Sequence, residues 1–125
     1  MAKILLVDDE KKIVEILALF LAKMGFEIIS LFGGEEAVEF LKSGKKADLM
    51  LLDMKMPKVT GLDVLKEKKS LNDTTPVIIL TGSTGQEEAY EQLKEFGFSR
   101  EDIIYKPVDL FFLLTEIKKK LDMMT

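Results

Sequence analysis

Five polar residues each follow directly after a short apolar run, and their side chains could bind a cation and perform nucleophilic chemistry. Three of them are carboxylates, one is a hydroxyl and one is an ammonium. A carboxylate can act both as a nucleophile and as a ligand for a hard metal ion. The five residues are Asp8 and Asp9 after residues 4–7, Asp53 after residues 49–52, Thr81 after residues 77–80, and Lys106 after residues 103–105.

The composition of the 125-residue chain narrows this chemistry. There is no Cys, which excludes disulfides, thiol nucleophiles and thiolate metal sites. There is no His either, which removes the commonest general base and the commonest zinc ligand. Any reaction must therefore use carboxylates, hydroxyls and Lys.

Three carboxylates gathered at one place repel one another. At a separation of ~4 Å and an effective dielectric of ~20, each pair of like charges costs about 4 kcal/mol. Lys106 supplies one positive charge, which is too little for three, so either a carboxylate is protonated or a cation binds. An all-oxygen site suits Mg²⁺, whose open positions can hold phosphoryl oxygens.

The hydrophobic pattern predicts the elements that position these residues. Short unbroken apolar runs are typical of strands buried on both faces of a parallel sheet, and residues 28–31 add a fifth run. Segments with helical period lie between the runs, and Gly25, Gly44 and Gly97 end three of them. The apolar stripe of the first helix is predicted to contain Ile13, Ile16, Leu17, Phe20, Leu21 and Met24. The stripe of the second helix is predicted to contain Ala37, Val38 and Leu41, and that of the fourth helix Ala89, Leu93 and Phe96. The stripe of the last helix is predicted to contain Leu110, Leu113, Leu114, Ile117 and Leu121. A shorter third helix is predicted from Leu62 to about Lys69.

Strand and helix alternate five times, which predicts a doubly wound α/β sandwich with a five-stranded parallel sheet in one domain, residues 1–125. Ligands of such sheets bind beyond the carboxyl ends of the strands. Each polar residue alone has a plain structural role, since Asp8 or Asp9 can cap a helix and Asp53 can begin a turn. Those separate roles give no reason for all five to follow strands at one edge of the sheet.

The charge distribution restricts the partners. The formal net charge is −4, both signs are interspersed and neither end carries a basic run, which argues against direct nucleic-acid binding. No segment approaches the roughly 20 apolar residues that cross a bilayer. The apolar start runs into Asp8 and Asp9, unlike a secretory signal. We therefore expect a cytoplasmic protein that does not associate with membranes.

Several short motifs occur in one order along almost the whole chain. They are Val7-Asp8-Asp9, Asp53-Met54-Lys55-Met56-Pro57, Gly61, Leu80-Thr81-Gly82 and Lys106-Pro107. From Lys3 to about Leu121, this arrangement resembles the receiver domain of the two-component response regulators, including the chemotaxis regulators. The resemblance implies a flavodoxin-like fold with five helices and the strand order 2-1-3-4-5.

The resemblance also implies a role for each motif residue. Asp53 would accept a phosphoryl group from a sensor histidine kinase or a phosphotransfer protein. Asp9 would bind Mg²⁺ directly, Asp8 would bind it through water, and the backbone carbonyl of Lys55 would complete the coordination. Thr81 and Lys106 would hold oxygens of the attached phosphoryl group. The Lys106–Pro107 peptide would be cis, a geometry that is accessible mainly before proline.

Phosphorylation is expected to change a surface at some distance from Asp53. The resemblance implies that the change spreads from Thr81 to the fourth helix, the fifth strand and the fifth helix, which then bind a partner or an output domain. A phosphorylation-dependent dimer is one possibility. Phe112 is predicted to lie opposite the buried stripe of the last helix, with Phe111 at its margin, either as a docking surface or as ordinary exposed apolar residues.

The chain departs from the family pattern in several places. The family usually has Tyr or Phe three residues before the Lys, where this chain has Ile103, and Tyr105 is predicted to lie on the other sheet face. The stretch from residue 97 to residue 106 is about two residues longer than usual. Lys68 stands where the third helix often has an apolar residue. Val108 follows Pro107 where Phe is common.

Two further positions are expected to set the lifetime of the phosphoryl group. Lys55 and Ser83 each stand two residues beyond a motif residue and would flank the path of an attacking water.

Three other functions remain as alternatives. An aspartate-nucleophile phosphatase of the haloacid-dehalogenase class also uses Asp and Mg²⁺, but its nucleophile lies in an Asp-x-Asp pattern after the first strand. The second alternative is a domain that only binds partners and is never phosphorylated. It is compatible with Ile103, which stands where the family usually has an aromatic residue. A flavin carrier of the same fold would need a phosphate-binding loop after the first strand, where Asp8 and Asp9 repel phosphate.

Overall fold

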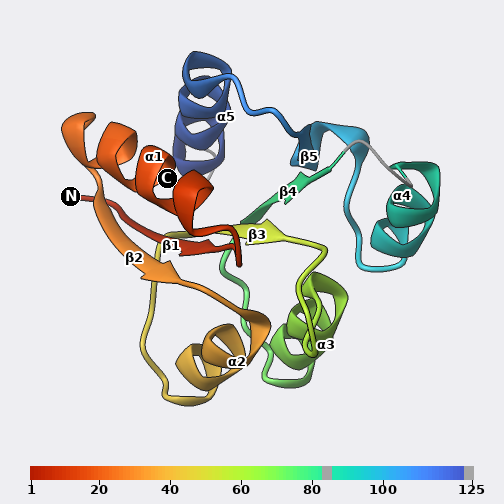
Figure 1. The fold of residues 1–125 in the computed structure, drawn as a ribbon. Helices are drawn as coiled ribbons and strands as arrows, with labels where there is room; N and C mark the ends of the chain where they lie inside the picture. The colour runs from red at the N-terminus through yellow and green to blue at the C-terminus, as the bar shows by residue number, and fades with distance from the viewer. Residues whose placement is uncertain (83–85, 123–125) are drawn as a thin grey trace.

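The computed structural model describes residues 1–82 and 86–122. Five parallel strands form one sheet in the order β2-β1-β3-β4-β5, and five α-helices alternate with them, which confirms the predicted topology (Figure 1). None of the helices in the described residues is both long and apolar enough to span a membrane. The elements in chain order are β1 (Lys3–Val7), α1 (Lys11–Lys23), β2 (Glu27–Leu31), α2 (Gly34–Lys42), β3 (Leu49–Asp53), α3 (Gly61–Ser70), β4 (Val77–Thr81), α4 (Gln86–Lys94), the 3₁₀ turn η1 (Arg100–Asp102), β5 (Ile103–Tyr105) and α5 (Leu110–Asp122).

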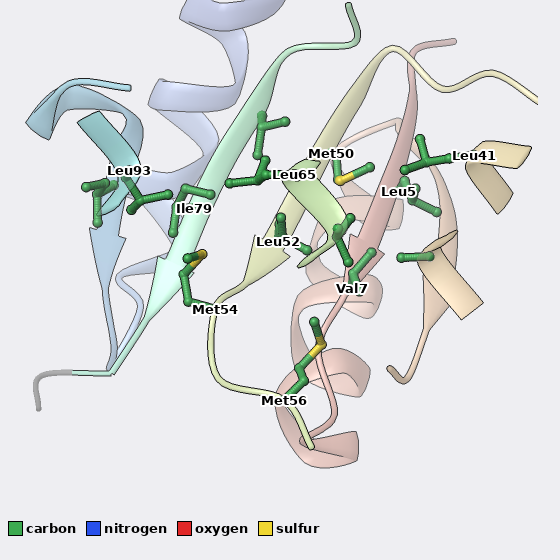
Figure 2. Close-up of a cluster of buried hydrophobic side chains, with 14 residues drawn as sticks. Leu5, Val7, Leu41, Met50, Leu52, Met54, Met56, Leu65, Ile79 and Leu93 are labelled. Atoms are coloured by element: carbon green, nitrogen blue, oxygen red, sulfur yellow. The ribbon is translucent and has the colours of Figure 1, made fainter. Parts of the chain in front are cut away.

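The core consists of two apolar layers, one on each face of the sheet. Leu5 and Val7 of β1 face the layer under α2, α3 and α4, whereas Ile4 and Leu6 face the layer under α1 and α5. Because successive strand residues point to opposite faces, a strand covered on both sides must be apolar throughout. Figure 2 shows the first layer, where side chains of the central strands meet Leu41 and Leu65 from the helices.

The buried stripe of α1 differs from the predicted one. Val14, Leu17 and Leu21 are buried, but Ile16 is 57% exposed and Met24 is 43% exposed, so their predicted place in the stripe is wrong. Residues 14, 17 and 21 recur every three or four positions, which keeps them on one side of a helix. Ile16 precedes Leu17 by one residue and is therefore turned about a quarter of a circle away.

Strand β2 is also less buried than predicted. It lies at the edge of the sheet, and its residues are half-buried apart from Glu27, which is exposed. An edge strand has a neighbour on one side only, so its apolar run reflects partial cover by α1 and α2 rather than full burial on both faces.

The longer segment before β5 forms an additional 3₁₀ turn, η1, which the sequence pattern does not predict. Ser99 and Asp102 make a reciprocal capping box around it, and Lys120 of α5 forms an ion pair with Asp102. After this turn, Ile103 and Tyr105 both face the layer under α4. The prediction that Tyr105 lies on the other sheet face is therefore wrong, because residues two apart in a strand share a face.

Candidate functional site

The strand registers bring the predicted polar residues to one edge of the sheet. Asp53 and Thr81 are the last residues of β3 and β4, and both are buried. Asp8 and Asp9 follow β1 directly, and Lys106 follows β5. The residues paired near these strand ends are Val7 with Leu52, Asp53 with Leu80, and Thr81 with Tyr105. Parallel strands therefore place all five chemical groups at their common carboxyl edge.

Three carboxylates form the centre of the site. Asp8 is fully buried, Asp53 is almost fully buried, and Asp9 is half-buried. One carboxylate oxygen from each lies within 4.8 Å of the other two. Asp8 Oδ2 has one close cation within the described residues, the ammonium of Lys106 at 2.9 Å. One ammonium does not neutralise three neighbouring carboxylates, and carboxylate oxygens are the ligands that a hard divalent ion prefers, so these donors fit such an ion.

Lys106 is the cation that the chain itself supplies. Its Nζ lies 2.9 Å from Asp8 Oδ2, 3.0 Å from Glu10 Oε1 and 3.6 Å from Asp53 Oδ1. Burial alone would lower the pKa of this ammonium, but contacts with Asp8 and Glu10 outweigh burial and raise the pKa above its usual range. Lys106 is therefore a permanent positive charge facing the carboxylates.

Asp53 has a strongly perturbed acidity. Burial, followed by repulsion from Asp8, raises its pKa to about 7, although Lys106 and a hydrogen bond from the Lys55 backbone oppose the change. The Lys55 amide donates to Asp53 Oδ1 at 3.4 Å, the same oxygen that faces Lys106. Without metal, Asp53 thus gains a proton as the pH falls through about 7, and a bound cation would favour loss of that proton.

The loops around the site are fixed by close backbone contacts. The Glu10 amide donates to Asp8 Oδ1 at 2.9 Å and orients that carboxylate. The Gly61 amide donates to the carbonyl of Met54 at 3.0 Å, at the start of α3. A Cβ on Gly61 would lie 2.5 Å from the carbonyl oxygen of Asp53, so only glycine lets α3 begin so close to the end of β3.

The remaining predicted residues surround this centre. Thr81 and Lys55 line a cavity of about 380 Å³ between the start of α3 and α4. The carbonyl of Thr81 accepts a hydrogen bond from the Lys106 amide at 2.7 Å, and the Lys106–Pro107 peptide is cis as expected. Ser83 lies outside the described residues.

Glu10 is the site residue that sequence reasoning missed. It is the third acid in the run Asp8-Asp9-Glu10, and no motif of the sequence assigned it a role. In the structure its side chain makes no cap hydrogen bond and instead accepts one from Lys106, which is 96 residues away in the chain. The contact between Glu10 and Lys106 depends on how the ends of β1 and β5 meet. No sequence pattern close to either residue predicts it.

The chain matches a known family over most of its length. A family model described as the response regulator receiver domain matches residues 4–118. The transcriptional regulatory protein DltR of Streptococcus agalactiae is 34% identical over 116 residues, which are 93% of this chain and 50% of DltR. The alkaline phosphatase synthesis transcriptional regulatory protein PhoP of Bacillus subtilis is 32% identical over 105 residues, 84% of this chain and 42% of PhoP. The chain thus spans about half the length of these curated relatives.

Solved structures agree with this match. The receiver domain of Francisella response regulator 1452 has a TM-score of 0.86 and 30% sequence identity, and the comparison covers 100% of both chains. A response regulator receiver domain protein from Clostridium thermocellum has a TM-score of 0.86 and 31% identity, covering 99% of this chain and 97% of that one.

Proposed function

This chain belongs to the response regulator receiver family, and we propose that Asp53 is the residue on which it accepts a phosphoryl group. Receiver domains of this family act as phosphorylation-activated switches in two-component signalling. The observation that supports Asp53 is its burial at the carboxyl edge of the sheet, within reach of Asp8, Asp9 and Lys106.

In the proposed step, a carboxylate oxygen of Asp53 attacks the phosphorus of the donor. A bond forms between that oxygen and phosphorus, and the bond between phosphorus and the donor atom breaks, so that the leaving group keeps the electron pair. Lys106 neutralises charge on the phosphoryl oxygens, and the hydroxyl of Thr81 donates a hydrogen bond to one of them. The product is an acyl phosphate on Asp53.

The acidic cluster is proposed to hold Mg²⁺. Asp9 and Asp53 would bind it directly, Asp8 through water, and the backbone carbonyl of Lys55 would add a further ligand. When bound, the ion supplies the positive charge that lowers the pKa of Asp53 and offsets the charge of the incoming phosphoryl group. This assignment is supported by the three carboxylate oxygens within 4.8 Å of one another, which outnumber the single ammonium of Lys106 beside them.

Phosphorylation is proposed to act on the surface formed by α4, β5 and α5. The added charge beside Thr81 changes the local field, and the surface then controls a partner protein or an output domain, one form of which is a phosphorylation-dependent dimer. Ile103 is buried and has no ring that could turn. Tyr105 lies on the same sheet face and is half-buried, so an aromatic response is proposed for Tyr105 rather than for position 103.

The proposed donor is a sensor histidine kinase or a phosphotransfer protein, and the proposed location is the cytoplasm. Self-phosphorylation from small acyl phosphates and self-dephosphorylation are part of the proposal, because the groups that catalyse transfer belong to the receiver itself. The relatives DltR and PhoP are named as transcriptional regulators, and this chain matches about half of each. For the chain itself, with its net charge of −4, we propose no direct contact with nucleic acid.

One experiment tests the central assignment. The protein is incubated with acetyl phosphate, with and without Mg²⁺, and intact mass is measured for the wild type and Asp53→Asn. A gain of one phosphoryl group in the wild type only, and only with Mg²⁺, is expected. An equal gain in Asp53→Asn would place the phosphoryl group on another residue, and multiple turnover of a phosphate ester would favour the phosphatase alternative.

A further inference from the structure

The side chain of Lys106 donates a hydrogen bond to a residue other than Asp53, although its proposed role is to hold the phosphoryl group on Asp53. Its Nζ donates to Glu10 Oε1 at 3.0 Å, whereas the distance to Asp53 Oδ1 is 3.6 Å. Asp8 Oδ2 lies 2.9 Å from the same Nζ and is its other close partner. Lys106 is therefore held between two carboxylates, those of Asp8 and Glu10, and lies further from Asp53.

Glu10 is the exposed member of this group. Its side chain is 57% exposed, whereas the Lys106 side chain is 13% exposed and Asp8 is fully buried. Glu10 occupies the N-cap position of α1 without capping it, and the first turn of α1 contains no acidic residue. The Glu10 carboxylate therefore makes no hydrogen bond to the helix that follows it and accepts one from Lys106 instead. An exposed acid can leave its partner without stranding a buried charge, which Asp8 cannot do.

We infer that Glu10 is a positioning residue: a displaceable counter-anion that holds Lys106 in the unphosphorylated chain and must release it when a phosphoryl group occupies Asp53. This inference rests on the proposed function of Asp53. Phosphoryl oxygens on Asp53 would draw the ammonium toward Asp53 and away from Glu10, because its Nζ lies 3.0 Å from Glu10 Oε1 but 3.6 Å from Asp53 Oδ1. Glu10 thereby sets how readily the phosphorylated state forms, although it touches neither the phosphorus nor Asp53.

Competition between Glu10 and the phosphoryl group for Lys106 predicts a result that a purely structural role of Glu10 would not produce. Glu10 adds a negative charge near the acidic cluster, which favours a cation but opposes an anion. Glu10→Gln is therefore expected to weaken Mg²⁺ binding and to strengthen binding of beryllofluoride, a tetrahedral analogue of the phosphoryl group, in saturating Mg²⁺. Each change is expected to be about two- to fivefold, because the exposed side chain is partly screened by solvent.

The variant Glu10→Asp tests the contact with Lys106 separately from the negative charge at position 10. The shorter side chain keeps the negative charge near the site but reaches Lys106 less well. Mg²⁺ affinity is then expected to stay near the wild-type value, while beryllofluoride affinity rises as it does in Glu10→Gln. Glu15→Gln is the matched control, because Glu15 is an exposed acid one turn further along α1.

The experiment is isothermal titration calorimetry of the wild type, Glu10→Gln, Glu10→Asp and Glu15→Gln with Mg²⁺, and then with beryllofluoride in saturating Mg²⁺. Opposite shifts in Glu10→Gln, with Glu15→Gln unchanged, support the inference. Unchanged affinities in Glu10→Gln, or shifts in the same direction for both ligands, overturn it. If the wild type binds neither ligand, the proposed function of Asp53 fails. If the wild type binds both ligands and Glu10→Gln binds them with the same affinities, only the proposed role of Glu10 is rejected.

Discussion

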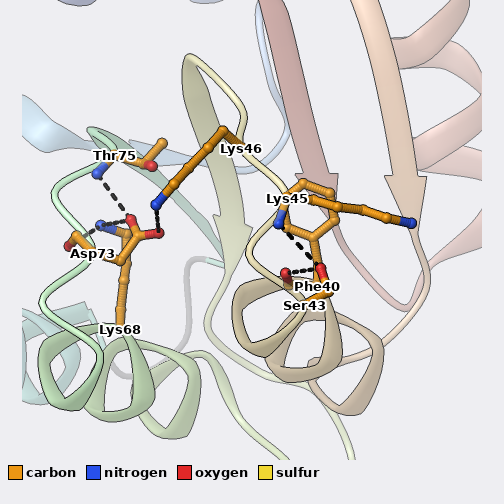
Figure 3. Close-up of polar contacts among 7 residues, drawn as sticks. All are labelled: Phe40, Ser43, Lys45, Lys46, Lys68, Asp73 and Thr75. Carbon is orange, nitrogen blue, oxygen red and sulfur yellow. Dashed lines mark hydrogen bonds and ion pairs between the residues drawn. The ribbon is translucent and has the colours of Figure 1, made fainter.

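Lys68 of α3 and Asp73 of the following loop form a buried ion pair. Lys68 Nζ lies 3.1 Å from Asp73 Oδ1 and also donates to the backbone carbonyl of Asp73 at 3.0 Å (Figure 3). The two side chains are only 9% and 8% exposed. Burial would raise the pKa of Asp73, but the Thr75 amide and Lys68 outweigh it and lower the pKa. The Lys68–Asp73 pair thus fixes the connection between α3 and β4.

Removal of either partner of this pair should destabilise the fold. Lys68→Met leaves the Asp73 carboxylate buried with less compensation, and we expect a loss of about 2–4 kcal/mol in the free energy of unfolding. Urea denaturation measures it. Lys66→Met, on an exposed position of the same helix, is the control and should change stability by less than about 0.5 kcal/mol. A loss in Lys68→Met no larger than in Lys66→Met would show that the ion pair contributes nothing.

The stability of the metal-free protein should fall as the pH rises from about 4 to about 7. In this window Asp53, with its pKa raised to about 7, is protonated in the folded state and ionised in the unfolded state. The folded state therefore binds more protons, and the free energy of unfolding decreases by up to about 1.4 kcal/mol per pH unit. Urea denaturation in EDTA at several pH values measures the slope.

Two comparisons assign that slope to Asp53. Asp53→Asn is neutral at every pH, so its slope should be much smaller and its stability at pH 7.5 higher than that of the metal-free wild type. Mg²⁺ should stabilise the wild type more at pH 7.5 than at pH 5, because protons compete with the ion for Asp53. A slope of equal size in Asp53→Asn would mean that another group is responsible.

Arg100 should restrain α4. Its guanidinium lies 4.0 Å from the Tyr90 ring centroid, and its Nη2 lies 3.2 Å from Glu87 Oε2, so η1 is tied to the first turns of α4. Within the described part of α4, Leu93 is the one side chain that is fully buried. Arg100→Ala should therefore increase amide hydrogen exchange in α4 by about three- to tenfold and leave exchange in the central strands near the wild-type rate.

Hydrogen exchange followed by mass spectrometry tests this restraint. Lys118→Ala, which removes an exposed cation from α5, is the control and should leave exchange in α4 unchanged. If α4 exchanges at the wild-type rate in Arg100→Ala, the contacts of Arg100 with Tyr90 and Glu87 do not hold the helix.

Lys55 and Ser83 should tune the lifetime of the phosphoryl group without being needed for its attachment. Lys55 is exposed and lines the cavity that also contains Thr81, which supports a place beside the path of an attacking water. Exchange of Lys55 or Ser83 for Ala should change the rate of self-dephosphorylation several-fold. Intact mass, followed over time after removal of acetyl phosphate, measures the decay. Wild-type decay in both variants would refute the prediction.

Much of the fold could be read from the sequence because its signals are local. Residues 4–7, 49–52 and 77–80 are unbroken apolar runs, and the structure places them in three neighbouring strands covered on both faces. Gly25, Gly44 and Gly97 all have positive φ at the ends of helices, as their positions predicted. The candidate site residues were also found in this way, because each stands at the end of a strand or just after it, and parallel strands bring their carboxyl ends together.

Only the tertiary structure decided which of these groups touch. The hydrogen bond between Lys106 and Glu10, the buried pair of Lys68 and Asp73, and the common face of Ile103 and Tyr105 all depend on how elements pack. The exposure of Ile16 has the same origin, since the sheet and α5 select which side of α1 is buried. Sequence patterns specify periodicity along one element, whereas charge pairing and burial are set by neighbours distant in the chain, and these exist only after folding.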